Sequence, residues 1–167
     1  MSIPLVDQAT EEKLVTLKNV SWEQFKGIEA HLQDNRNVRL SYLSGVLEIM
    51  SPIGEKHEKV KRTLSLLLEA YMRVLGIRFY ARGGFTLEEP GYASGTPDES
   101  YSIGQEKEIP DIVIEVIVTS GTIDRKELFK PKKVPEVWFW KSNTIKIFRL
   151  GVNGEYEAVT RSGFSLI

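Results

Sequence analysis

The sequence predicts an α/β fold, in which helices flank a mixed central sheet. Residues 112–118 are almost all Ile and Val, which is typical of a strand covered on both faces. Residues 54–75 place apolar side chains at helical spacing, which predicts a long amphipathic helix. The other segments alternate between helical patterns and strand patterns. A sheet with helices packed on it accommodates all three observations.

We expect an N-terminal arm over residues 1–20, because no clear hydrophobic period is visible there. A single domain then spans residues 21–167, a length that suits one hydrophobic core. Its first helix begins after Ser21, the predicted N-cap, and Gln24 completes a capping box. Apolar residues at helical spacing extend this helix to about Asp34.

A β-hairpin follows, because residues 38–43 and 46–50 alternate around a Ser-Gly turn. The long helix over residues 54–75 comes next, and Gly76 is its predicted C-terminal cap. One face of this helix is expected to pack on the sheet, and it carries His57, Val60, Leu64, Leu67, Tyr71 and Val74.

The second half of the chain is predicted to consist mostly of strands. Candidate strands cover residues 77–81, 85–89, 96–103 and 110–118, with a loop over residues 90–95. A short helix opens at Gly121, and Pro131 must end it. A second hairpin, formed by residues 137–140 and 145–150, precedes an edge strand over residues 156–160.

Composition narrows the classes of function. The chain has no cysteine, which excludes disulfides and thiolate metal sites. Its only histidines are His31 and His57, so a metal site must consist mainly of carboxylates, which suit Mg²⁺ or Mn²⁺. No apolar run reaches the roughly 18 residues of a membrane span, and the N-terminus has no signal-peptide pattern. We therefore expect a cytoplasmic protein without a membrane partner.

Charge is distributed unevenly along the chain, although the net charge is only −1. Residues 85–115 contain eight acids and one base, whereas residues 121–150 contain eight bases and three acids. Acids that could hold a cation thus lie next to bases that could hold phosphate. Mutual neutralisation on a solvated surface is the alternative interpretation.

Asp98 and Glu115 are the acids that most need an explanation. They lie on separate candidate strands, and the loop between them is long enough to bring these strands side by side. Burying a carboxylate in an apolar strand is costly unless a cation or a metal compensates its charge. Hydrolysis of a phosphodiester uses a metal held by carboxylates and a cation that stabilises the developing charge. Asp98 could instead be a turn residue after Pro97, and Glu115 could form an ion pair.

Three further polar residues allow a structural and a functional interpretation. Asp111 follows Pro110 and is expected to belong to a turn. His57, on the apolar face of the long helix, is either a hydrogen-bonded core residue or faces the metal site and orients phosphate or water. Glu48 alternates with Leu47 and Ile49, so we expect it to face solvent unless it supplies a third carboxylate.

An ordered set of short motifs runs through most of the chain. It comprises Met50-Ser51-Pro52 with His57, Pro97-Asp98-Glu99, Pro110 to Val116, Thr119-Ser120-Gly121 with Ile123-Asp124, and Val134 to Trp138. This set resembles the Uma family of restriction endonucleases, which belongs to the PD-(D/E)XK nuclease superfamily. The resemblance covers roughly residues 38–150.

The resemblance implies a restriction-endonuclease-like fold, with Asp98 and Glu115 as ligands of Mg²⁺ or Mn²⁺ and the Val116 carbonyl beside them. The superfamily motif has a lysine two positions after the second acid, where this chain has Ile117. In similar sequences the lysine has moved to the following helix, which implies Arg125 or Lys126 here. His57 would assist these residues.

The leading hypothesis is therefore a metal-dependent endonuclease that hydrolyses phosphodiester bonds in DNA. The alternative is a catalytically weak or inactive nuclease fold that binds DNA or protein, because Ile117 replaces the motif lysine. A homodimer is also expected, because the hairpin over residues 138–150 is apolar at alternate positions.

Overall fold

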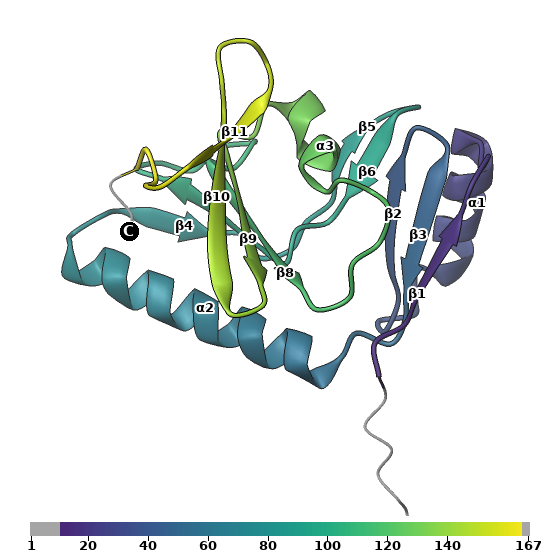
Figure 1. Ribbon diagram of the computed structural model, residues 1–167, viewed down its shortest axis with the longest axis horizontal. Coiled ribbons are helices and arrows are strands. Elements are labelled where there is room, and N and C mark those ends of the chain that lie inside the picture. Colours follow the sequence, from purple (N-terminus) through teal and green to yellow (C-terminus); the bar gives the residue numbers. More distant parts are fainter. Residues whose placement is uncertain (1–10, 165–167) are drawn as a thin grey trace, which may run out of the picture.

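The computed structural model describes residues 11–164, which form two sheets and the helices that cover them (Figure 1). The first sheet has the order β1 (Leu14–Leu17), β3 (Val46–Met50), β2 (Arg39–Leu43), β6 (Ala93–Gly95), β5 (Leu87–Glu89). The second has the order β11 (Tyr156–Val159), β10 (Thr144–Leu150), β9 (Glu136–Lys141), β8 (Ile112–Ile117), β7 (Glu99–Ile103), β4 (Phe79–Ala81). β8 and β9 are parallel, whereas β8 and β7 are antiparallel, so the second sheet is mixed. The predicted restriction-endonuclease-like α/β fold is confirmed.

The first helix, α1 (Trp22–Leu32), begins as the sequence predicts. The Ser21 hydroxyl accepts a hydrogen bond from the Gln24 amide at 3.1 Å, and the Gln24 side chain accepts one from the Ser21 amide at 2.8 Å. This capping box satisfies two amides that have no partner inside the helix. Phe25 then stacks on Tyr42 of β2, with ring centroids 4.9 Å apart, and so holds α1 on the first sheet.

Two segments differ from the sequence-based predictions. Part of the predicted arm forms β1, which pairs with β3, and residues 1–10 lie outside the described residues. β6 lies within the predicted loop over residues 90–95 and pairs with both β2 and β5. Its sequence, Ala-Ser-Gly, has weak strand propensity, so pairing on both sides stabilises the strand instead.

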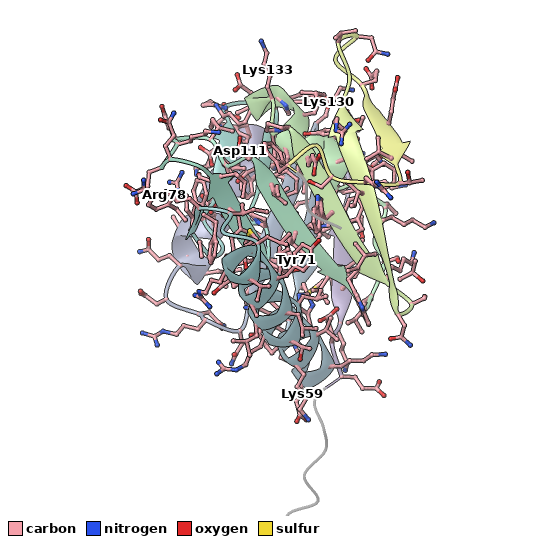
Figure 2. The ribbon with its side chains drawn as sticks, turned by 90° about the vertical axis from the view of Figure 1, so that its left-hand side faces the viewer. Lys59, Tyr71, Arg78, Asp111, Lys130 and Lys133 are labelled. Atoms are coloured by element: carbon pink, nitrogen blue, oxygen red, sulfur yellow. The ribbon has the colours of Figure 1, made fainter. Side chains whose placement is uncertain are left out.

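The long helix, α2 (Glu55–Val74), lies across the second sheet (Figures 1 and 2), but the buried face differs from the predicted one. His57, Leu68 and Met72 are buried, whereas Leu67 and Val74 are 64% and 85% exposed. The predicted core position of Leu67 is therefore wrong. The apolar residues of this helix are not confined to one side, so their spacing alone does not determine which part meets the sheet.

β8 is covered on both faces, as its Ile and Val residues predict. Ile112 and Ile114 pack with α2, in a core that includes Tyr101 and Trp138. Val113 points the other way, into a core formed with Leu128, Phe129, Val134 and Val137. Side chains along a strand alternate between faces, so Glu115 lies on the Val113 side.

The segment after β8 forms two short helical turns, α3 (Lys126–Phe129) and a 3₁₀ turn over Lys130–Lys132. The helix therefore begins five residues after Gly121, and Pro131 lies at the start of the 3₁₀ turn instead of ending α3. Both predicted hairpins, β2–β3 and β9–β10, and the edge strand β11 are present. Among the described residues, no helix is long and apolar enough to cross a membrane.

Candidate active site

Four of the predicted site residues, His57, Glu115, Val116 and Arg125, line a pocket between the two sheets. The pocket has a volume of about 210 Å³. Arg39 and Glu48 line it from the first sheet, Glu115 and Lys141 from the second, and residues 119–125 close one side. His57 reaches it from the first turns of α2. The fold thus brings together groups that are far apart in the sequence.

Asp98, immediately before β7, is bound on every side. Its amide donates to the Ile114 carbonyl at 3.0 Å, and its Oδ2 accepts from the Val116 amide at 2.6 Å. These two bonds place Asp98 beside Glu115 on the neighbouring strand. Its Oδ1 accepts from His57 Nε2 at 2.8 Å and from the Arg39 guanidinium. Burial alone would raise the pKa of Asp98, but the His57 hydrogen bond and the Arg39 charge hold it well below its usual range.

Glu115 is 1% exposed, and it forms an ion pair with Arg125. Arg125 donates to Glu115 Oε1 at 2.9 Å and to the Ser41 hydroxyl at 3.0 Å. Burial raises the pKa of Glu115; the Arg125 charge opposes this rise, and the Asp98 charge adds to it. The two carboxylates therefore interact electrostatically inside the pocket.

His57 connects Asp98 to the N-terminal segment. Its Nδ1 lies 2.9 Å from Glu12 Oε2, and its Nε2 lies 2.8 Å from Asp98 Oδ1. A carboxylate accepts hydrogen bonds, so Nε2 donates to Asp98, and the imidazole is positively charged when Nδ1 also donates to Glu12. Burial lowers the pKa of His57, but the hydrogen bond and charge of Asp98 outweigh it, so the pKa lies above its usual value.

Lys126 and Asp111 do not join the carboxylate pair. The Lys126 ammonium group bonds Asp124 at 3.0 Å and lies 4.7 Å from the centre of the Phe148 ring. Only Arg125 of the two predicted cations therefore contacts Glu115. Asp111 accepts hydrogen bonds from Lys107 and from the Ile103 amide, which is a role in a turn.

Glu48 is buried, so the expectation that it faces solvent is wrong. Its Oε1 accepts from the amides of Thr122 and Ile123, at 2.6 and 2.8 Å. A Cβ atom at position 121 would lie 2.2 Å from the same oxygen, so Gly121 is the residue that lets the loop approach Glu48. Glu48 thus fixes the loop that leads to Arg125.

The donor set has the chemistry of a divalent-metal site. Asp98, Glu115 and the Val116 carbonyl offer oxygen ligands, and Mg²⁺ is commonly held by one or two carboxylates and waters. Within residues 11–164, no three His, Asp or Glu side chains form a metal-binding cluster. Arg39 and Arg125 occupy carboxylate oxygens instead. These donors fit an ion held by two carboxylates, provided that Arg39 releases Asp98.

Sequence reasoning missed three residues of this site. Arg39 and Ser41 share one face of β2, so a period of two could have identified Arg39 as an inward-facing cation. Glu12 precedes β1, and no pattern in the sequence connects it to His57. The other carboxylate oxygen of Glu12, Oε1, is buried without a hydrogen-bond partner among the described residues.

A family model described as "Uma2: Putative restriction endonuclease" matches residues 22–165. No curated protein matches the chain. The matched span contains each predicted site residue and excludes Glu12.

Proposed function

The chain belongs to the Uma2 family, and we propose that it is a metal-dependent endonuclease that hydrolyses phosphodiester bonds in DNA. One observation carries this proposal. Asp98, immediately before β7, and Glu115, on the neighbouring strand β8, are both buried, and Glu115 lines a pocket together with Arg39, Arg125 and His57. Two buried acids surrounded by cations suit a reaction in which a metal and a phosphate bind together.

In this proposal Asp98, Glu115 and the Val116 carbonyl hold Mg²⁺ or Mn²⁺. The ion supplies a Lewis acid for the phosphate and lowers the pKa of a bound water. His57 keeps Asp98 ionised, because its positive ring donates to the carboxylate. Arg125 is positioned by Ser41 and Glu115, and its planar guanidinium suits a phosphate oxygen. The cytoplasmic location expected from the sequence stays a prediction.

The alternative is a nuclease fold that binds DNA or protein with little or no catalysis. Ile117 favours it, because the face next to Glu115 then has an apolar side chain where the superfamily motif has a lysine. Arg125 does not replace a lysine that activates water, because a guanidinium stays protonated. The two proposals differ in one observable, metal-dependent cleavage.

Nicking of supercoiled plasmid separates these proposals. We expect purified protein to nick DNA with Mg²⁺ or Mn²⁺ but not with EDTA. Glu115→Gln should lower the rate at least about 100-fold, since it removes a charged ligand of the ion. Glu106→Gln, in an exposed turn, is the matched control and should retain the wild-type rate. If the plasmid stays intact with both metals, or if Glu115→Gln keeps full activity, the endonuclease proposal is rejected. The alternative, a nuclease fold that binds DNA or protein, then remains.

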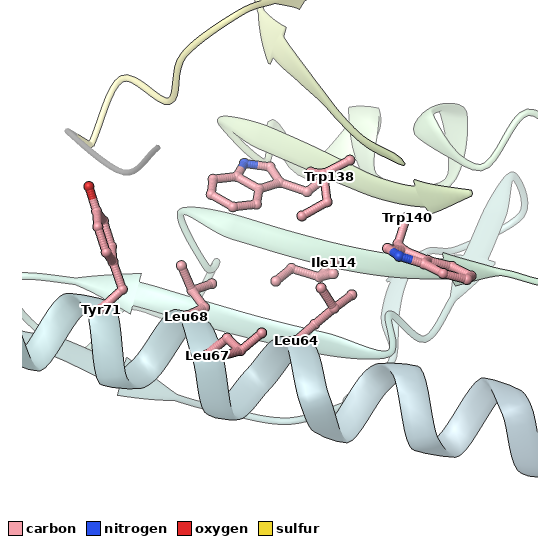
Figure 3. A pocket seen from close by; sticks show the side chains of 8 residues that line it. Leu64, Leu67, Leu68, Tyr71, Ile114, Trp138 and Trp140 are labelled. Atoms are coloured by element: carbon pink, nitrogen blue, oxygen red, sulfur yellow. The ribbon is translucent and has the colours of Figure 1, made fainter. Parts of the chain in front are cut away.

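We also propose that the protein is a homodimer. An apolar groove of about 240 Å³ runs between α2 and the second sheet, and Figure 3 shows α2 side chains facing Ile114, Trp138 and Trp140. On the same helix, Leu66 and Val74 are also exposed. In a pair related by a two-fold axis, exposed apolar side chains of each copy's α2 can enter the groove of the other copy. Contiguous exposed apolar surface can mark a protein–protein interaction site.

A further inference from the structure

The cations of the pocket differ in whether they already have partners. Arg39 pairs with Asp98, and Arg125 pairs with Glu115 and Ser41. Lys141, at the end of β9, also lines the pocket and is exposed. Within residues 11–164, neither an ion pair nor a hydrogen bond engages its ammonium group. Lys141 can therefore bind an incoming anion without first breaking an internal contact.

The strand register places Lys141 on the same side of the sheet as Glu115. β8 and β9 are parallel, with Glu115 opposite Phe139 and Ile117 opposite Lys141. Residues paired in this way project to the same face, and residues two apart on one strand share a face. Lys141 thus lies one strand away from Ile117, about 4.8 Å across the sheet. Its flexible four-carbon stem allows the ammonium group to reach over that short step.

We infer that Lys141 contacts the scissile phosphate and supplies the cation that Ile117 lacks. This inference rests on the proposed endonuclease function. A phosphate held beside Glu115 brings negative charge to a pocket whose arginines are already paired. An unpaired ammonium group can then donate to a non-bridging oxygen and stabilise the charge that develops there. Lys126 cannot take this role where it lies, because Asp124 holds it.

The test removes the cation at position 141 and then places one at position 117. Lys141→Gln should lower the nicking rate about 100-fold, the scale seen when one transition-state donor is removed. Adding Ile117→Lys to that variant should restore at least tenfold, because position 117 is its neighbour on the same face. Lys59→Gln is the matched control, since Lys59 lies at the lower end of α2 in Figure 2 and is 73% exposed. It should keep the wild-type rate.

Binding gives a second readout that does not depend on catalysis. With Ca²⁺ in place of Mg²⁺, the affinity of each variant for a short DNA duplex is measured against salt concentration. Lys141→Gln should reduce the slope of log K against log salt by about 0.9, the loss of one phosphate contact. Thermal melting checks that the double variant is folded.

The outcomes distinguish failure of the Lys141 inference from failure of the proposed endonuclease function. If wild-type protein neither nicks nor binds DNA, the proposed function fails and the role of Lys141 fails with it. Suppose instead that the wild type nicks DNA, and that Lys141→Gln nicks within twofold of its rate and has the same salt slope. The proposed role of Lys141 then fails, and the endonuclease function stands. Arg125 would then be the phosphate contact. Loss of rate with an unchanged salt slope would also overturn the inference.

Discussion

The buried acids of this pocket depend on their neighbours for charge compensation. Asp98 accepts hydrogen bonds from three groups, and Glu115 pairs with Arg125. A single buried carboxylate without such partners would take up a proton instead. These neighbours shift the two acids in opposite directions: the pKa of Asp98 is lowered by His57 and Arg39, and that of Glu115 is raised by its burial.

The charge on His57 gives a pH dependence of stability. Its pKa is raised, with Asp98, Glu12 and Arg39 facing the ring, so its contribution is complete below about pH 6.5, the usual value for histidine. The contribution falls as pH rises through the raised pKa. His57→Gln should cost about 1.5–3 kcal/mol at pH 5.5, the range for hydrogen bonds to charged groups, and less at pH 9.

Urea unfolding of the wild type and His57→Gln across this pH range measures the difference. A difference in unfolding free energy between the two proteins that narrows with rising pH supports a positively charged His57. A constant difference across this pH range would contradict a contribution from a charge on His57.

At the scale of single elements, β8 and α2 differ in how well sequence describes them. β8 is apolar on both sides, so its buried position follows directly from composition. The capping box of α1 and the two-residue turns of both hairpins are likewise local signals. The face of α2 depends on which strands lie beneath it, and so it cannot be predicted from the helix alone.

Two neighbouring leucines of α2 test that face. Leu68 is 8% exposed and packs in the core with Ile114 and Trp138, so Leu68→Ala should cost about 2–5 kcal/mol. Leu67→Ala should change the unfolding free energy of the monomer by less than about 0.5 kcal/mol, as for most surface positions. Chemical denaturation at low protein concentration gives both values. Equal losses at the two positions would mean that the helix is rotated from the position described.

At the scale of the whole molecule, the sequence predicts the fold class, the order of most elements and the pairing of Asp98 with Glu115. It misses contacts between distant segments, because nothing local links Arg39 to Asp98 or Glu12 to His57. β6 escapes prediction for the same reason, since its two partner strands stabilise it. The site therefore depends on how the two sheets meet.

The apolar groove beside α2 and the exposed Leu66 and Val74 predict self-association. Light scattering after size-exclusion chromatography should give twice the chain mass of 19.0 kDa. Leu67→Glu should give a monomer, because a carboxylate cannot be buried in an apolar interface without a partner. Gln105→Glu, in an exposed turn, adds the same charge and should stay dimeric. A wild-type monomer at high concentration would contradict the dimer.

The central claim is that Asp98 and Glu115 share a divalent ion. Anomalous diffraction from crystals soaked in Mn²⁺, at a concentration that saturates nicking, tests it most directly. We predict an anomalous peak within about 2.0–2.6 Å of an oxygen from each carboxylate, the range for oxygen ligands of such ions, with the Arg39 guanidinium moved away from Asp98. A map without density between these carboxylates, and with Arg39 still bound to Asp98, would contradict the claim.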